Sequence, residues 1–192
     1  TKCCDYLRNK FGFEKDCFYI LYAPTFRDNY SLEGYKLEYE KIVKEFSAKV
    51  NKKVKMVVRL HPNVWNQSNF INYGENILNG TIYPDMQELL YAADVLITDY
   101  SSSMWDFSLT RRPCFLYATD LNYYDLDRGF YSDIHTWPYP LAESNSALIK
   151  NIKQFNNDQY QKNIQKHWDA LGSYESGHAC ETVANYILTS NT

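Results

Sequence analysis

Short apolar runs alternate with helix-like stretches along the first two-thirds of the chain. The runs typical of buried strands are residues 17–23, 54–60, 94–98 and 113–117, with a weaker one at 77–82. The stretches expected to be helical are residues 32–50, 85–93 and 101–110. Strands that alternate with helices in this way are typical of parallel βαβ units. The pattern therefore predicts an α/β fold: a Rossmann-like, open parallel sheet with helices on both faces.

The last third of the chain has a different character. Residues 118–141 are rich in aromatic residues, Asp and Pro and show no periodic pattern, and loops of this length are usually functional or disordered. Three helices are expected after them, at about 143–155, 158–171 and 176–189. Because no repeat, low-complexity tract or linker divides the chain, we expect residues 1–192 to form a single domain with a helical C-terminal tail.

Composition narrows the classes of protein. The chain has 192 residues, of which 45% are hydrophobic and 22% charged, and its net charge is −3. This acidic balance argues against binding to nucleic acid, and no apolar run is long enough for a transmembrane segment. The cysteines and histidines show no metal-ligand spacing, so neither a metal nor another cofactor is expected. An odd number of cysteines without repeated spacing fits reduced thiols and a cytoplasmic location.

Polar residues follow four of the predicted strands. Ligands of an open parallel sheet bind in the crevice beyond the carboxyl ends of its strands, so residues at these ends are candidates for a binding site. The candidates at or just beyond the strand ends are Arg27, Arg59, His61, Thr98, Asp99, Ser101, Ser102, Ser103 and Asp120. We expect the four strand ends to converge on one rim of the sheet.

The strongest single feature is the segment 98–103, Thr-Asp-Tyr-Ser-Ser-Ser, at the start of a predicted helix. Backbone N–H groups, hydroxyls and the helix dipole at such a start can hold a phosphate without a lysine. On these residues alone, an alternative stays open, in which Asp99 or Ser101 merely caps the helix. Asp106, one turn further on, is either a surface residue or a group that reaches ribose hydroxyls.

His61 lies directly after a predicted strand. A histidine in this place suits acid–base catalysis or donation to a phosphate oxygen, and a hydrogen-bonded loop histidine is the alternative. Arg27, Arg59 and Arg128 suit bidentate contacts with phosphate. The chain has no G-x-G-x-x-G, no Walker lysine motif and no G-x-S-x-G, which counts against those nucleotide-binding and hydrolase classes.

Several segments, taken in series, carry a resemblance to a known family. In chain order they are 22–27 (YAPTFR), 59–62 (RLHP), 96–102 (LITDYSS), 106–107 (DF), 112–124, 128–131 (RGFY) and 177–179 (GHA). In this order and spacing they resemble the CDP-glycerol glycerophosphotransferases, the polymerases and primases of wall teichoic acid and related polymers. The resemblance covers roughly residues 18–187, and the series of motifs is specific.

The resemblance implies one half of a GT-B architecture, in which two Rossmann-like halves face each other across a cleft. This chain is expected to be the C-terminal, donor-nucleotide-binding half, with the N-terminal acceptor half absent, and the start at Thr1 suggests a piece of a longer protein. The implied donor is CDP-glycerol or a related CDP-polyol. Glycerol phosphate passes to a hydroxyl of a lipid-linked, teichoic-acid-like polymer, and CMP is released. The fragment alone is expected to be inactive or weakly active, and the full-length protein cytoplasmic and peripheral to the membrane.

The resemblance also implies roles for individual residues. An essential histidine of the family corresponds to His61, the catalytic candidate, and the phosphate-binding turn corresponds to Ser101 and Ser102. The other residues assigned to contacts with the donor are Arg27, Arg59, Ser103, Asp106 and Arg128. Thr98 and Asp99 are assigned to helix capping or to structure.

Two other functions stay open beside this one. A GT-B glycosyltransferase of capsule or surface polysaccharide synthesis, which uses a UDP- or CMP-sugar, would share the architecture. A module that binds a nucleotide without catalysing a reaction would share the donor site. Within the leading interpretation, glycerol, ribitol and other polyols all remain open as the donor alcohol.

Overall fold

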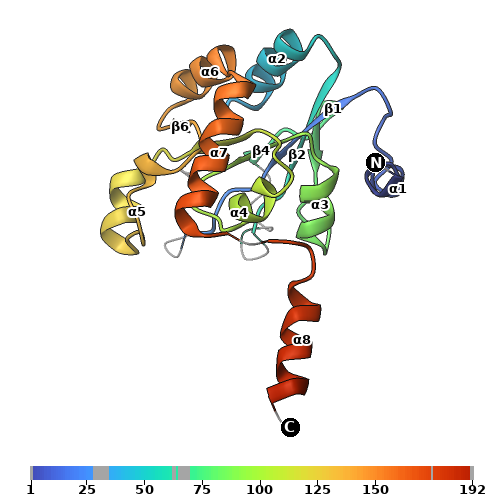
Figure 1. The fold of residues 1–192 in the computed structure, drawn as a ribbon. Coiled ribbons are helices and arrows are strands. Elements are labelled where there is room, and N and C mark those ends of the chain that lie inside the picture. Colours follow the sequence, from blue (N-terminus) through green and yellow to red (C-terminus); the bar gives the residue numbers. More distant parts are fainter. Residues whose placement is uncertain (1, 28–34, 62–63, 65–69, 174, 191–192) are drawn as a thin grey trace.

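The computed structural model describes residues 2–27, 35–61, 64, 70–173 and 175–190. Six strands form one open sheet in the order β3-β2-β1-β4-β5-β6, and all five pairings between neighbouring strands are parallel (Figure 1). The predicted α/β class with an open parallel sheet is therefore confirmed.

The bounds of the elements follow the predicted pattern closely in the first two-thirds of the chain. The strands are β1 (Phe18–Tyr22), β2 (Val54–Val58), β3 (Ile77–Asn79), β4 (Val95–Thr98), β5 (Cys114–Tyr117) and β6 (Leu141–Ala142). The helices are α1 (Lys2–Lys10), α2 (Tyr39–Val50), α3 (Met86–Ala92), α4 (Ser103–Ser108), α5 (Leu121–Asp127), α6 (Asn145–Gln154), α7 (Asn157–Leu171) and α8 (Ala179–Ser190), with a 3-10 turn at Ile134–Thr136. Part of the expected helix 32–50 and Pro62 lie outside the described residues.

Both faces of the sheet are covered by helices. Successive residues of each strand point to opposite faces, so each strand contributes apolar side chains to two core clusters. Ile20 and Tyr22 of β1 belong to a core cluster that includes the apolar side chains of α2 and α6. Tyr19 and Leu21 of the same strand belong to a second cluster, with side chains of α3, α4 and α7. The strands β1, β2, β4 and β5 are buried on both sides, which explains why they read as nearly continuous apolar runs in the sequence.

The strand order reverses between β1 and β4. From β1 the chain first builds outward through β2 to β3, and it then returns to the other side of β1 to build β4, β5 and β6. The loops after β1 and β4 therefore diverge and leave a crevice at their carboxyl ends, which is the usual ligand site of such sheets.

Three elements differ from the expectations. The segment 118–141 is not one long loop, because it contains α5 and the 3-10 turn and leads into β6. In α5 only Leu121 is buried, so the helix leaves no apolar periodicity in the sequence. The helix α1 also escaped prediction, and β6 has only two residues, too few for a strand pattern.

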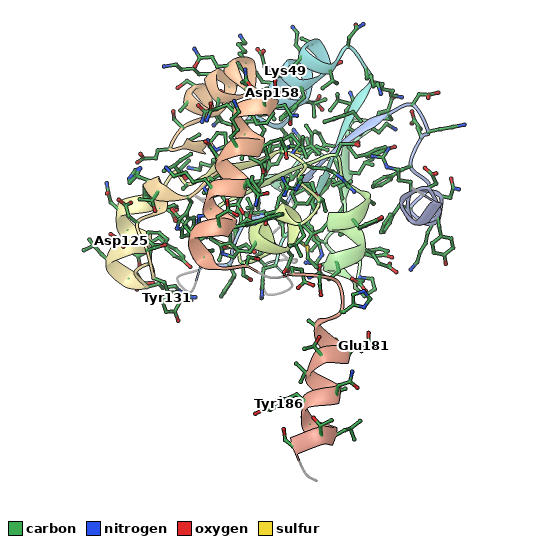
Figure 2. All side chains as sticks on the ribbon, viewed as in Figure 1. Lys49, Asp125, Tyr131, Asp158, Glu181 and Tyr186 are labelled. Carbon is green, nitrogen blue, oxygen red and sulfur yellow. The ribbon has the colours of Figure 1, made fainter. Side chains whose placement is uncertain are left out.

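The last helix stands apart from the rest of the molecule. Figure 1 shows α8 projecting away from the sheet and its covering helices, and Figure 2 shows the side chains of Glu181 and Tyr186 on it. None of its residues is buried, and Tyr186 is 71% exposed. Within the described residues, no helix is long and apolar enough to cross a membrane.

Candidate functional site

A cavity of about 620 Å³ lies at the crevice between the carboxyl ends of β1, β2 and β4. It brings together seven of the eight residues predicted to contact a donor: Arg59, His61, Ser101, Ser102, Ser103, Asp106 and Arg128. They come from the loops after β2 and β4, from α4 and from the end of α5. The predicted convergence of strand ends on one rim is confirmed for β1, β2 and β4, whereas the described lining includes no residue from the end of β5.

A second cavity, of about 700 Å³, lies beside residues 35–41 and Ile77 of β3. It is lined mostly by apolar surface, from Tyr35, Tyr39 and Phe70 among others, and it holds none of the predicted residues. Its volume exceeds that of the cavity at the crevice, and its lining includes charged residues such as Lys36, Glu38 and Lys41, but it lies away from the strand ends that carry the predicted residues. The candidate site is therefore the cavity at the crevice.

The serine turn leads from β4 into α4. Ser101 Oγ accepts a hydrogen bond from Ser103 N–H at 3.3 Å and lies 2.9 Å from Ser103 Oγ. Ser102 is the N-cap residue, and its side chain makes no capping hydrogen bond. Helix α4 has six residues rather than the predicted ten, so the N–H groups and hydroxyls of its first turn matter more here than a long helix dipole.

Asp99 does not cap the helix, which corrects one of the alternatives. Its Oδ1 accepts from Tyr100 N–H at 2.6 Å and from Thr25 N–H at 2.8 Å, and its carboxylate therefore ties the β1 loop to the β4 loop. The Thr98 hydroxyl donates to the carbonyl oxygen of Ala23 at 2.7 Å, a contact that suits the structural role assigned to it. Both contacts fix the two strand ends that border the crevice.

Arg59 brings positive charge to the cavity. Its Nη2 donates to Tyr83 O at 3.4 Å, and its Nε is buried without a hydrogen-bond partner in the described part of the chain. Burial lowers the pKa of Arg59, although Asp85 opposes this shift. A second buried atom without a partner, Thr25 Oγ1, belongs to another residue of the same lining. Buried polar atoms are normally paired, so these two suit an oxygen-rich ligand.

His61 and Asp106 lie at different parts of the lining. The His61 side chain is exposed, and its ring lies 5.3 Å from the ring of Phe26 between centroids, with an interplanar angle of 30°. Asp106 accepts a hydrogen bond from Gln87 Nε2 at 2.9 Å. Asp106 therefore has a defined partner in the site rather than being an isolated surface residue.

Other lining residues escaped the sequence analysis: Thr25, Phe26, Met86, Gln87 and Tyr100. Met86 and Gln87 form the start of α3, which follows a weak strand and carried no signal of a site. Thr25, Phe26 and Tyr100 lie inside the strand-end motifs, so their position at a strand end was the available signal.

Arg27 lies beside the cavity rather than in it, which corrects its assignment to direct contact with the donor. It is 5% exposed and is not part of the lining. Its guanidinium contacts Asp99 and Asp120, and Tyr100 completes a group that we name the Arg27 cluster: Arg27, Asp99, Tyr100 and Asp120. A guanidinium already held by two carboxylates has little donor capacity left for a phosphate.

The charges of the lining favour an anion. Arg59 and Arg128 supply two guanidinium groups, and Asp106 is the only carboxylate among the lining side chains of the described residues. In the described part of the chain, no group of three or more His, Cys, Asp or Glu side chains is placed to hold a metal ion. The site therefore offers hydroxyls, N–H groups, an imidazole and guanidinium groups, which together suit phosphate oxygens.

Comparison with known proteins places this arrangement in a family. Residues 1–189 match the family described as CDP-Glycerol:Poly(glycerophosphate) glycerophosphotransferase. A teichoic acid poly(glycerol phosphate) polymerase of Bacillus spizizenii is 31% identical over 186 residues, which cover 95% of this chain and 47% of that protein. The chain thus spans about half the length of this relative.

Two solved structures show the same fold. The wall teichoic acid polymerase TagF, in a variant soaked with CDPG, superposes with a TM-score of 0.78 at 29% identity, over 98% of this chain and 46% of that one. The UDP-GlcNAc 2-epimerase from Neisseria meningitidis shares the fold alone, with a TM-score of 0.56 at 15% identity over 98% of this chain and 50% of that one. These likenesses confirm the predicted Rossmann-like fold of the GT-B kind, and with the match over residues 1–189 they show that the chain belongs to the CDP-glycerol:poly(glycerophosphate) glycerophosphotransferase family.

Proposed function

We propose that the cavity binds the diphosphate of CDP-glycerol or a related CDP-polyol. The observation that carries this proposal is the meeting of His61, Arg59 and Arg128 with the turn Ser101–Ser103 in one cavity at the reversal of strand order. The chain is then the donor-binding half of a transferase, and the acceptor half lies in another part of the full-length protein. The span of the chain, about half of its relatives, supports this division.

The serine turn is the proposed site of the phosphates. Within the described residues, the N–H groups of Ser101 and Ser102 donate to no protein acceptor, and the Ser102 side chain is exposed. These groups and the hydroxyls of the turn bind phosphate oxygens, and Arg59 and Arg128 neutralise the negative charge. Asp106, held by Gln87, accepts hydrogen bonds from the ribose hydroxyls.

The proposed reaction is the transfer of polyol phosphate. A hydroxyl oxygen of the acceptor attacks the β-phosphorus, its bond to phosphorus forms, and the bond from phosphorus to the bridging oxygen breaks. CMP leaves with that oxygen, and the proton of the attacking hydroxyl passes to a base supplied by the acceptor half. Catalysis of such a transfer rests mainly on positioning and on stabilising charge that develops on the phosphate oxygens. His61 donates a hydrogen bond to one of these oxygens.

The remaining parts of the proposal concern the whole protein. Its acceptor is a lipid-linked polymer, so the full-length enzyme works at the cytoplasmic face of the membrane as a peripheral protein. The 192 residues alone bind the donor but turn it over poorly, because the acceptor half is needed to bring the attacking hydroxyl and its base to the phosphorus.

Calorimetric titration with CDP-glycerol, CDP-ribitol and UDP-glucose tests the proposal. We expect a CDP-polyol to bind at one site per chain, with His61→Ala weakening that binding, and UDP-glucose to bind much more weakly. Stronger binding of UDP-glucose would contradict the proposal in favour of a sugar transferase. If a preparation of the full-length enzyme with His61→Ala forms product at the rate of the unaltered enzyme, the catalytic role of His61 is wrong.

A further inference from the structure

We infer that the Arg27 cluster is a positioning unit that holds three walls of the cavity in the geometry that binds the donor. The inference rests on the proposed function, since it concerns the same site. It goes beyond that function because it assigns the effect mainly to Arg27, Asp99 and Asp120, which do not line the cavity. The three walls are the β1 loop with Thr25, the serine turn Ser101–Ser103, and the end of α5 with Arg128.

The cluster is held by hydrogen bonds to every carboxylate oxygen. Arg27 Nη2 donates to Asp99 Oδ2 at 2.8 Å and to Asp120 Oδ1 at 3.0 Å, and Arg27 Nε donates to Asp120 Oδ2 at 2.7 Å. The Tyr100 hydroxyl donates to Asp120 Oδ1 at 2.9 Å. Asp99 Oδ1 accepts from two backbone N–H groups, as described above. A buried ionic group with this degree of pairing has one favoured arrangement.

The four members of the cluster are distributed over the three walls. Arg27 Nη1 donates to Thr25 O at 2.7 Å, which fixes the β1 loop. Asp99 and Tyr100 immediately precede the serine turn. Asp120 immediately precedes α5, the helix that leads to Arg128. One guanidinium therefore joins all three walls, together with the direct hydrogen bonds from Thr25 N–H to Asp99 and from the Tyr100 hydroxyl to Asp120.

Aromatic contacts extend the cluster along α5. The ring of Tyr124 stacks on that of Tyr100 with centroids 3.8 Å apart and an interplanar angle of 20°. The Arg27 guanidinium carbon lies 4.9 Å from the Tyr100 centroid and 5.5 Å from the Tyr124 centroid. Arg128 N–H donates to Tyr124 O at 2.9 Å, so the backbone that carries the Arg128 side chain is tied to the same stack.

The charge balance of the cluster also matters for an anion. Arg27 offsets two carboxylates, Asp99 and Asp120, whose side chains are 1% and 18% exposed. Without Arg27, both would face an anion site through a few ångströms of protein of low dielectric. Lysine restores the charge but not the planar fork that reaches both carboxylates and Thr25 O together.

Three variants test the inference: Arg27→Lys, Arg27→Met and the double variant Arg27→Met with Asp120→Asn. The affinity for CDP-glycerol is measured by calorimetry at a temperature at which circular dichroism shows each variant folded. We expect Arg27→Lys to raise the dissociation constant about tenfold, as a displaced contact does. The double variant should bind more tightly than Arg27→Met, because one uncompensated carboxylate is removed. If Arg27→Met does not fold, Arg27→Lys and Tyr100→Phe carry the test.

The control for lost stability is Ile164→Val, a buried residue of α7 outside the cavity. It should lower the midpoint of thermal unfolding and leave the dissociation constant unchanged. If folded Arg27→Lys binds CDP-glycerol as tightly as this control, the cluster has only a structural role and the inference is wrong.

Amide hydrogen exchange separates failure of the inference from failure of the proposed function. In Arg27→Lys we expect faster exchange confined to residues 100–103 and 121–128, with α2 unchanged. If the unaltered chain binds no CDP-glycerol, the proposed function fails, and the exchange still tests whether the cluster holds these walls. Unchanged exchange in both segments would overturn the inference by itself.

Discussion

The Arg27 cluster and the lining of the cavity lie side by side at the same sheet edge, yet they use charge in opposite ways. In the cluster, Arg27 is 5% exposed and is held by two carboxylates. In the lining, the Arg128 side chain is 42% exposed, and Arg59 has a buried Nε without a partner in the described residues. The Arg128 guanidinium also lies 4.0 Å from Asp127, but this pair is exposed, whereas the buried pairs of Arg27 fix a framework.

The comparison also shows why residue type and position at a strand end do not settle a role. Arg27 and Arg59 both follow strands of the sheet and both suit phosphate in the sequence. The difference between them arises from acidic partners, which Arg27 has in the loops after β4 and β5. Substitutions in the cluster should therefore change stability first, and substitutions in the lining should change binding.

The largest expected effect is on folding. Arg27→Met removes the cation between the buried carboxylate of Asp99 and the partly exposed carboxylate of Asp120. Breaking a buried pair such as Arg27–Asp99 costs about 3–5 kcal/mol. We expect the free energy of unfolding, measured by urea denaturation, to fall by about this amount. Arg128→Met is the matched control and should change it by less than about 0.5 kcal/mol. Equal losses in the two variants would remove the distinction between cluster and lining.

The next effect is on binding. His61→Ala removes a donor to a charged phosphate oxygen, and hydrogen bonds to charged groups contribute about 1.5–3 kcal/mol, or roughly a 10- to 150-fold change in the dissociation constant. Calorimetry with CDP-glycerol should show this loss, with an unchanged free energy of unfolding. His135→Ala, at an exposed position outside the cavity, is the control and should bind like the unaltered chain.

A smaller effect is expected at the ribose. Asp106→Ala removes an acceptor that Gln87 holds in place. Its proposed partners are neutral ribose hydroxyls, so the lost hydrogen bonds are weaker than those to a charged phosphate oxygen. We expect the dissociation constant for CDP-glycerol to rise about three- to tenfold. The affinity for 2′,3′-dideoxy-CDP, which lacks the ribose hydroxyls, should be the same in Asp106→Ala and the unaltered chain. If Asp106→Ala weakens binding of this analogue as much as binding of CDP-glycerol, the contact with ribose is contradicted.

The smallest effect is on the response to acid. Burial raises the pKa of Asp120, but the hydrogen bond and charge of Arg27 outweigh it and hold this pKa below its ordinary value. A carboxyl group with a lowered pKa stabilises the fold above the unfolded-state pKa, about 4, and this contribution is lost as the pH falls below it. Stability of the unaltered chain should therefore decline more steeply below pH 4 than that of Asp120→Asn. If the free energy of unfolding, measured by chemical denaturation, falls equally steeply in both proteins below pH 4, the pairing of Asp120 with Arg27 is contradicted.

Much of the fold was predictable because the strands are buried on both faces. Runs such as 114–117 are continuously apolar and buried. Asp85 caps α3, because Glu88 N–H donates to Asp85 Oδ1 at 3.1 Å. Helix α5 was not predictable, because its exposed surface leaves only Leu121 buried. The periodicity of apolar residues in a sequence reflects which side chains are buried. A helix that buries few side chains therefore shows little periodicity.

The candidate site divides in the same way. Arg59, His61 and the serine turn were predictable because parallel strands bring their carboxyl ends to one edge, whereas Asp106 and Arg128 were assigned to the donor site from the family resemblance. The burial of Arg27 was not, since its partners Asp99 and Asp120 are 72 and 93 positions away in the chain. Gln87 was missed because its role depends on the approach of α3 to α4, which no local pattern reports.

The central claim is that the cavity at the reversal of strand order holds the diphosphate of a CDP-activated polyol. A crystal structure of this chain with CDP-glycerol tests it most directly. The account predicts density for both phosphates against the Ser101–Ser103 turn, with the imidazole of His61 within hydrogen-bonding distance of a phosphate oxygen. Well-defined ligand density in the apolar cavity beside Tyr35, with the crevice empty, would contradict it.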